Sequence, residues 1–173
     1  MARLFFALWP DQAVRDEVEK FARQLSLVNG RLVPASNTHI TLVFLGNVDE
    51  QTAESLSNQA NHICMNAFSL TLDQLGWWKK PKIAWLAPTH YPQVLPDLAA
   101  ELRKIARNTE VSLDERPYRP HLTLARKIKS PLLDAPARSI FWNINEFCLV
   151  ESKSGEMGVE YEVKQSWPLK FMR

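Results

Sequence analysis

The chain has 173 residues, of which 46% are apolar, enough for one sizeable domain with its own core. Charged residues make up 23% and the net charge is only +2, so phosphate recognition would depend on local placement of Arg and Lys rather than on a global field. No window approaches the roughly 20 apolar residues of a membrane span, and the short apolar N-terminus lacks the features of a signal peptide. We therefore expect a cytoplasmic protein that does not bind membranes.

Hydrophobic periodicity predicts strands and helices in alternation along the chain. The expected elements, in chain order, are a strand over 4–8, a helix over about 11–29, a strand over 39–45, a helix over 49–67, strands over 68–75 and 83–87, a helix over 93–108, and strands over 121–124, 140–144, 146–150 and 158–165. Asp11 is the expected N-cap of the first helix, and Gly30 marks its end. Residues 76–81 are expected to form a turn or an exposed loop. The run over 140–150 is also compatible with one bent strand.

The pattern His-x-Thr-Leu occurs twice, at residues 39–42 and 121–124, each time in an apolar, β-prone run. Residues i and i+2 of a strand point to the same face, so each copy places an imidazole beside a hydroxyl. A strand ending in proline, an amphipathic helix and a proline-containing loop precede both copies. This repeat, over about 3–46 and 82–126, indicates two lobes related by a pseudo-two-fold axis. The two His-Thr pairs would then face each other across one cleft.

Two such pairs suit phosphodiester chemistry. The ordinary pKa of histidine, near 6.5, lets His39 and His121 divide the roles of proton donor and acceptor. The hydroxyls of Thr41 and Thr123 can donate hydrogen bonds to phosphate oxygens. A single His-x-Thr motif would more often be a half-buried polar pair, and the repeated context is what favours a catalytic site.

A metal site is the main chemical alternative. Histidines that bind metals usually come with further His, Cys, Asp or Glu ligands at chelating spacing, and neither motif contains one. The remaining histidines, His62 and His90, also lack such neighbours. We therefore expect catalysis with no metal and no other cofactor.

At these motifs the sequence resembles the 2H phosphoesterases, and among them the RNA 2′,3′-cyclic phosphodiesterases, also called 2′-5′ RNA ligases. The similar segments are Arg3–Pro10 (RLFFALWP), His39–Gly46 (HITLVFLG), Arg119–Arg126 (RPHLTLAR), Val150–Ser152, Tyr161 and Trp167–Leu169. The resemblance covers nearly the whole chain. His-x-Thr alone is a weak pattern, whereas two copies in these surroundings are a specific one.

The resemblance implies an α+β fold, with two pseudo-symmetric lobes of antiparallel sheet, outer helices and a central cleft, in a single bilobal domain over residues 1–173. It also implies hydrolysis of a terminal 2′,3′-cyclic phosphate of RNA to a 2′-phosphate, together with a reversible 2′-5′ RNA ligase activity. Carried over by motif position, His39 would give a proton to the leaving 3′ oxygen and His121 would activate water. Thr41 and Thr123 would hold the phosphate.

Further residues are candidates for binding substrate. Arg126 could add charge to the phosphate site, although strict strand alternation points it off the face of Thr123 unless a bulge or the strand end restores it. Arg119 is a comparable candidate for RNA contacts. Phe44 and Trp78 could stack on a base, although packing in the core is the favoured interpretation for Phe44, as it is for Trp9.

Trp77 and Trp78 precede three lysines, at positions 79, 80 and 82, in a segment that could follow an RNA backbone or form a solvated turn. The expected partners are RNA ends, tRNA halves among them, bound by a monomer. Two alternatives stay open. One is a 2H phosphodiesterase acting on a small cyclic nucleotide or an ADP-ribose cyclic phosphate, and the other is a non-catalytic RNA-binding module, which would not need both histidines.

Overall fold

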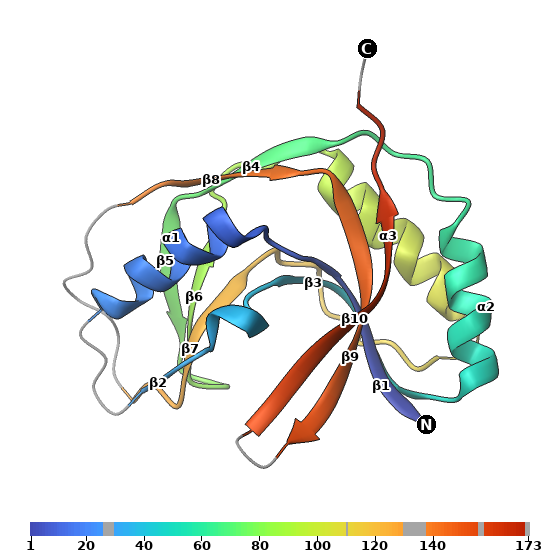
Figure 1. The fold of residues 1–173 in the computed structure, drawn as a ribbon, viewed down its shortest axis with the longest axis horizontal. Coiled ribbons are helices and arrows are strands. Elements are labelled where there is room, and N and C mark those ends of the chain that lie inside the picture. Colours follow the sequence, from blue (N-terminus) through green and yellow to red (C-terminus); the bar gives the residue numbers. More distant parts are fainter. Residues whose placement is uncertain (26–29, 110, 130–137, 156–157, 172–173) are drawn as a thin grey trace.

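The computed structural model describes residues 1–25, 30–109, 111–129, 138–155 and 158–171 (Figure 1). Its elements are β1 (Ala2–Leu8), α1 (Gln12–Arg23), β2 (Arg31–Leu32), the short 3-10 helix η1 (Ala35–Asn37), β3 (Ile40–Val48), α2 (Glu50–Ala60), β4 (Phe68–Leu72), β5 (Gln74–Trp78), β6 (Ile83–Ala87), α3 (Val94–Arg107), β7 (Leu122–Arg126), β8 (Ile140–Ile144), β9 (Glu146–Gly155) and β10 (Gly158–Pro168). No helix that it describes is long and apolar enough to cross a membrane.

The strands form two antiparallel sheets. The large sheet has the order β10-β9-β1-β3-β7-β6-β5, with β2 added beside β7, and the small sheet pairs β4 with β8. Helix α1 packs against β8 and β7, whereas α3 packs against β3 and α2. This mixture of helices and antiparallel sheets confirms the predicted α+β class.

The strand–helix–strand order β1–α1–β3 recurs as β6–α3–β7, and β3 and β7 meet at the middle of the large sheet. Each helix packs against the last strand of the other unit, because α1 contacts β7 and α3 contacts β3. The division into two interleaved lobes, with repeats over about 3–46 and 82–126, stays a prediction that this order supports.

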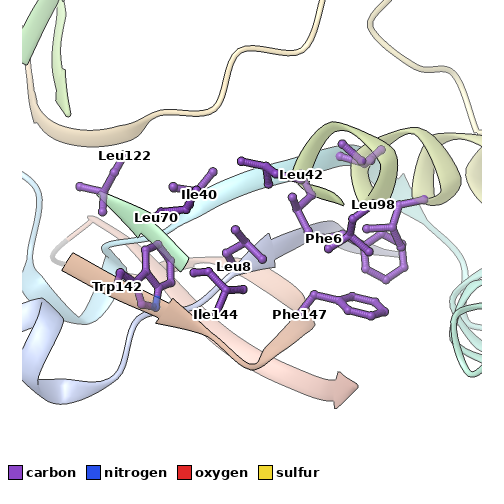
Figure 2. Close-up of a cluster of buried hydrophobic side chains, with 14 of the residues drawn as sticks. Phe6, Leu8, Ile40, Leu42, Leu70, Leu98, Leu122, Trp142, Ile144 and Phe147 are labelled. Atoms are coloured by element: carbon purple, nitrogen blue, oxygen red, sulfur yellow. The ribbon is translucent and has the colours of Figure 1, made fainter. Parts of the chain in front are cut away.

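The hydrophobic core lies between the two sheets and the helices. Side chains from β1, β3, β4, β7, β8, β9 and α3 meet in it (Figure 2). The labelled members are Phe6, Leu8, Ile40, Leu42, Leu70, Leu98, Leu122, Trp142, Ile144 and Phe147. One face of the large sheet is thereby buried, and the opposite face of its central strands is left for other side chains.

Several predicted boundaries differ from the observed ones. Helix α1 begins as expected, with Asp11 accepting a hydrogen bond from the Val14 amide at 2.9 Å, but it ends at Arg23 rather than near Gly30. Helix α2 ends at Ala60, and residues 65–67 pair with the C-terminal segment instead: the amide of Ala67 donates to the carbonyl of Lys170, and the amide of Lys170 donates to the carbonyl of Met65.

The expected strand over 68–75 is two strands in different sheets. The break falls at Asp73, whose carboxylate accepts hydrogen bonds from the amide and hydroxyl of Thr89 at 2.7 and 2.9 Å. The expected turn over 76–81 is wrong in its first half, because Gly76–Trp78 belong to β5 and pair with β6. The run over 140–150 is likewise two strands, β8 in the small sheet and β9 in the large one.

Candidate active site

The contact between β3 and β7 determines the position of the two motifs. The paired residues are Ile40 and Leu122, and both side chains are fully buried in the core. Side chains alternate along a strand, so the flanking His39, Thr41 and their counterparts at 121 and 123 point to the opposite face. Since the strands are antiparallel, each histidine lies on the side of the other motif's threonine. The structure therefore brings the two predicted pairs together on one face.

Both imidazoles are held in the same way. The Nδ1 atom of His39 lies 2.7 Å from the carbonyl oxygen of Asn37, and Nδ1 of His121 lies 2.8 Å from the carbonyl oxygen of Arg119. A carbonyl only accepts, so each Nδ1 carries the hydrogen. In the neutral ring the unprotonated atom is then Nε2. Each histidine thus presents Nε2 as its proton-exchanging atom.

The two histidines differ in their hydrogen bonds at Nε2. The hydroxyl of Thr41 lies 3.1 Å from Nε2 of His39 and donates to it when the ring is neutral. Among the described residues, Nε2 of His121 has no corresponding partner. The second imidazole is therefore the one whose Nε2 is available to an incoming water.

Aromatic rings surround His39 on three sides. Trp9 stacks on it with ring planes 16° apart and centroids 5.5 Å apart, and Phe5 and Tyr161 have centroids at 4.9 and 5.1 Å. His121 meets the ring of Trp78 edge-on, with centroids 4.7 Å apart. The first imidazole is consequently the more deeply enclosed of the two.

This enclosure changes the ionisation of both groups. Burial lowers the pKa of His39 to about 4, and the positive charge of Arg126 acts in the same direction, against the Asn37 hydrogen bond. Burial also lowers the pKa of His121, again with Arg126 contributing. Both imidazoles are therefore neutral at pH 7 in the free protein and can accept protons. A negatively charged neighbour, which would raise their pKa, is needed to keep either of them protonated at this pH.

A β-bulge places Arg126 on the same face as the motifs. Thr123 pairs with Trp85 and Ala125 pairs with Ala84, so Leu124 is an extra residue between them. The bulge shifts the alternation by one, and Arg126 regains the face of Thr123. Strict alternation, which pointed Arg126 away, is wrong here for this reason.

A β-bulge in β3 has the same effect on side-chain alternation. Ala7 pairs with Thr41 and Phe6 with Val43, which leaves Leu42 as the extra residue, and Phe44 then pairs with Phe5 on the face of His39. The interpretation of Phe44 as a core residue is wrong, because 45% of its surface is exposed. Phe44 and Arg126 thus occupy equivalent positions, three residues after the threonine of each motif.

The other candidates are also placed. Trp78 is half-buried against His121, and the side chain of Arg119 is exposed while its carbonyl holds that histidine. The guanidinium of Arg3 lies 5.0 Å from the ring centroid of Phe44, a cation–π contact.

Periodicity missed Phe5 and Tyr161 as neighbours of His39, because strands β1 and β10 come from opposite ends of the chain and are brought together only by the sheet order. The sequence contains no local signal for that pairing beyond the resemblance. Among the described residues, no three His, Cys, Asp or Glu side chains are grouped so as to hold a metal ion.

Paired imidazole and hydroxyl groups on one face of an antiparallel sheet define this protein as a phosphoesterase of the two-histidine class. The model of the LigT-like phosphoesterases matches residues 8–85. The RNA 2′,3′-cyclic phosphodiesterase of Escherichia coli K12 is 33% identical over 170 residues, which cover 96% of each chain. On this similarity the chain belongs to the LigT-like phosphoesterase family.

Other relatives agree. The RNA 2′,3′-cyclic phosphodiesterase of Archaeoglobus fulgidus is 26% identical over 75% of each chain. Among solved structures, E. coli LigT without ligand superposes with a TM-score of 0.89 at 32% identity, covering 97% of both chains. A structure described as a phosphoesterase gives a TM-score of 0.90 at 30% identity, covering 98% of this chain and 99% of the other.

Proposed function

We propose that this protein hydrolyses the 2′,3′-cyclic phosphate at the 3′ end of RNA to a 2′-phosphomonoester, without a metal ion. The observation that carries the proposal is the matched pair of imidazoles, each fixed through Nδ1 and each presenting Nε2 on one sheet face. Relatives that bear the name RNA 2′,3′-cyclic phosphodiesterase support the choice of substrate. So do crystal structures of E. coli LigT with phosphate and with 3′-AMP.

In the proposed reaction His121 is the base and His39 the acid. Nε2 of His121 takes a proton from water, and the resulting oxygen attacks phosphorus as the bond to the 3′ oxygen breaks. His39 gives its Nε2 proton to that leaving oxygen, so one proton is taken and one is given in each turnover. Nε2 of His121, which has no hydrogen-bond partner among the described residues, favours this histidine as the base.

His39, the proton donor, must first be protonated. The pKa of His39 is near 4 in the free protein because of burial, so binding of the negative phosphate has to raise it. Once Nε2 is protonated, the Thr41 hydroxyl accepts a hydrogen bond from it instead of donating one. The hydroxyl can then donate its hydrogen bond to a phosphate oxygen. Thr123 would bind the second non-bridging oxygen. Protonation of His39 and binding of the phosphate are thereby coupled.

The surrounding residues provide the remaining contacts. Arg126, brought to the site by its bulge, would neutralise phosphate charge, and before substrate binds its charge adds to burial in lowering the pKa of both imidazoles. Phe44 is exposed on the same face and would stack on the terminal base. Trp78 and Arg119 would contact the RNA on the side of His121.

The physiological setting belongs to the same proposal. We expect RNA ends as substrates, with tRNA halves as one natural source, and reversible 2′-5′ ligation, in which a 5′ hydroxyl replaces water as the nucleophile, as a further reaction. We also expect a monomer in the cytoplasm. Cys64 and Cys148, the cysteines of the chain, are both free thiols, as is usual in a reducing compartment.

The test is to incubate the protein with a short RNA ending in a 2′,3′-cyclic phosphate, in EDTA, and to identify the product by mass spectrometry and phosphatase mapping. A 2′-phosphate is the expected product. A 3′-phosphate would exchange the roles of the two histidines. Activity that EDTA abolishes and one divalent ion restores would contradict the metal-free chemistry. Turnover of small cyclic phosphates alone would favour a small-nucleotide phosphodiesterase, and binding without turnover would favour an RNA-binding module.

A further inference from the structure

Positive charge is unevenly distributed over the molecule. Residues 74–88 and 117–129 carry seven Lys and Arg side chains and no Asp or Glu, although the whole chain has 21 basic and 19 acidic residues. Six of these cations form what we call the basic edge. They are Lys79, Lys80, Lys82, Arg126, Lys127 and Lys129, all of them exposed.

The basic edge also differs from the rest of the surface in its pairing. Eight cations elsewhere in the described residues form ion pairs with carboxylates, as in Arg23 with Glu19, Arg107 with Glu115, and the Lys153 and Lys164 cluster with Glu162. Within the part of the chain that the structure describes, no carboxylate forms an ion pair with a member of the basic edge. Unmatched like charges repel, so such a group is tolerated at a cost that an anionic partner would remove.

Main-chain hydrogen bonds hold the two basic segments side by side. The amide of Ile128 donates to the carbonyl of Lys82 at 3.0 Å, and the amide of Lys82 donates to the carbonyl of Trp78 at 2.9 Å. Lys82 and Lys127 both have positive φ angles, of 67° and 61°, in the left-handed region that side chains rarely adopt. The turn after β5 and the end of β7 are thus built as one surface (Figure 1).

This surface continues from the active site. Trp78, whose ring meets His121, is the residue directly before Lys79. Arg126 belongs to both the phosphate site and the basic edge, and β2 adds Arg31 as its neighbour across the strands. An RNA whose cyclic phosphate lies between the two histidines could therefore extend over the basic edge without crossing an acidic region.

We propose that the basic edge binds the backbone phosphates of nucleotides upstream of the cyclic end, so that the enzyme prefers oligonucleotides over mononucleotides. The proposal rests on the proposed function and deepens it, because a mononucleoside 2′,3′-cyclic phosphate has no upstream phosphate to bind. Single-stranded RNA is the partner that fits: its phosphates recur along the chain, and Trp78 offers an aromatic surface between them and the site.

The size of the effect follows from counterion release. Each phosphate of a single strand that a cation neutralises contributes a slope of about −0.7 to log K against log salt. At 0.1 M salt, loss of one such contact weakens binding about 5-fold, and loss of two weakens it about 25-fold. Mononucleotide turnover should be unaffected by the same changes.

The experiment compares Lys82→Gln, Lys127→Gln and the double variant with two controls of equal charge change on helices, Lys20→Gln and Lys104→Gln. The first readout is kcat/KM on an unstructured eight-nucleotide RNA ending in a 2′,3′-cyclic phosphate and on a mononucleoside 2′,3′-cyclic phosphate. The second is binding of the same eight-nucleotide RNA with a non-cleavable 3′ end, measured by fluorescence anisotropy over a salt series.

We expect the double variant to lose about 25-fold in kcat/KM on the octamer and to reduce the salt slope by about 1.4, with mononucleotide turnover unchanged within 2-fold. Equal losses on both substrates, an unchanged slope, or the same losses in the helix controls would overturn the proposal. A wild-type protein that binds the octamer through these lysines but cleaves neither substrate would instead refute the proposed function and leave the binding surface standing.

Discussion

The hydroxyl of Thr41 lies 3.1 Å from Nε2 of His39, the atom that gives the proton in the proposed reaction. While the ring is neutral the hydroxyl hydrogen occupies this contact, and it becomes free only when Nε2 carries its own proton. In the proposed reaction Thr41 therefore stabilises the neutral ring before substrate binds and the bound phosphate afterwards.

Replacement of Thr41 by Val should separate these two effects. Without the hydroxyl donor, the pKa of His39 should rise from its value near 4, and kcat/KM should fall by about 10²-fold, as for the loss of one oxyanion donor. An NMR titration of the His39 ring and steady-state kinetics would measure the two changes. Thr41→Ser is the matched control and should retain both properties. A Val variant with wild-type turnover would show that the hydroxyl does not touch the phosphate.

Substitution of either site histidine should abolish most activity without unfolding the protein. His39→Gln and His121→Gln each remove an acid–base group, and each should reduce kcat by about 10³-fold or more. His62→Gln is the control, since His62 is exposed just after helix α2 and, among the described residues, its ring bonds to the main-chain carbonyl of Asn58. Thermal unfolding checks the fold of each variant. Near-normal turnover of either site variant would refute its assigned role.

The sequence was sufficient to find the four motif residues because their spacing depends only on strand periodicity. His39 and Thr41 share a face in any regular strand, and so do His121 and Thr123. The structure adds that the faces coincide, since Ile40 and Leu122 pair and both turn into the core. Pairing between distant strands was expected from the repeat, but its register is a tertiary property.

The residues that sequence reasoning misplaced are those that follow a bulge. Leu42 and Leu124 are extra residues opposite their partner strands, and nothing in their own side chains distinguishes them from ordinary core leucines. Alternation consequently points Arg126 to the wrong face, and the usual burial of large aromatic residues gives the wrong interpretation for Phe44. The end of α1 at Arg23 was missed for a related reason, because helical periodicity continues in the sequence after the hydrogen-bonded helix has ended.

The low pKa of His39 should make stability depend on pH. The unfolded chain binds a proton at this residue near pH 6.5, whereas the folded chain does so only near pH 4. The unfolded state therefore binds more protons between these values, and the free energy of unfolding should fall as the pH decreases from 6.5 to 4. The contribution is on the order of 1–3 kcal/mol, and His121 acts in the same direction.

Urea denaturation at several pH values would measure this dependence. The variant His39→Gln has no proton to bind in either state, so its stability should vary less over the same interval. His90→Gln, a residue outside the site, should retain the wild-type dependence. A wild-type curve that stays level from pH 6.5 to 4, or one that His39→Gln leaves unchanged, would show that the ring is not held neutral by burial.

The close approach of the Trp85 ring leaves room only for glycine at position 76. Gly76 pairs with Trp85, and a Cβ built on Gly76 would lie 2.0 Å from Cζ2 and 2.3 Å from Cη2 of that ring. Trp85 in turn pairs with Thr123 and lies 5.2 Å from Trp78, centroid to centroid, so displacement of its ring would reach the side of His121. Gly76→Ala should therefore destabilise the protein by about 1–3 kcal/mol and also reduce kcat.

A double-mutant cycle with Trp85→Phe tests the cause. Phenylalanine lacks the outer ring atoms that meet the new methyl group, so Gly76→Ala should cost much less in that background. Trp85→Phe alone should reduce stability only slightly for the number of atoms it removes. Nε1 of Trp85 is buried without a hydrogen-bond partner among the described residues, so removal of this atom leaves no polar group unpaired. Equal costs of Gly76→Ala in both backgrounds, measured by urea denaturation, would place the requirement for glycine in the main chain of β5 instead of in the contact with Trp85.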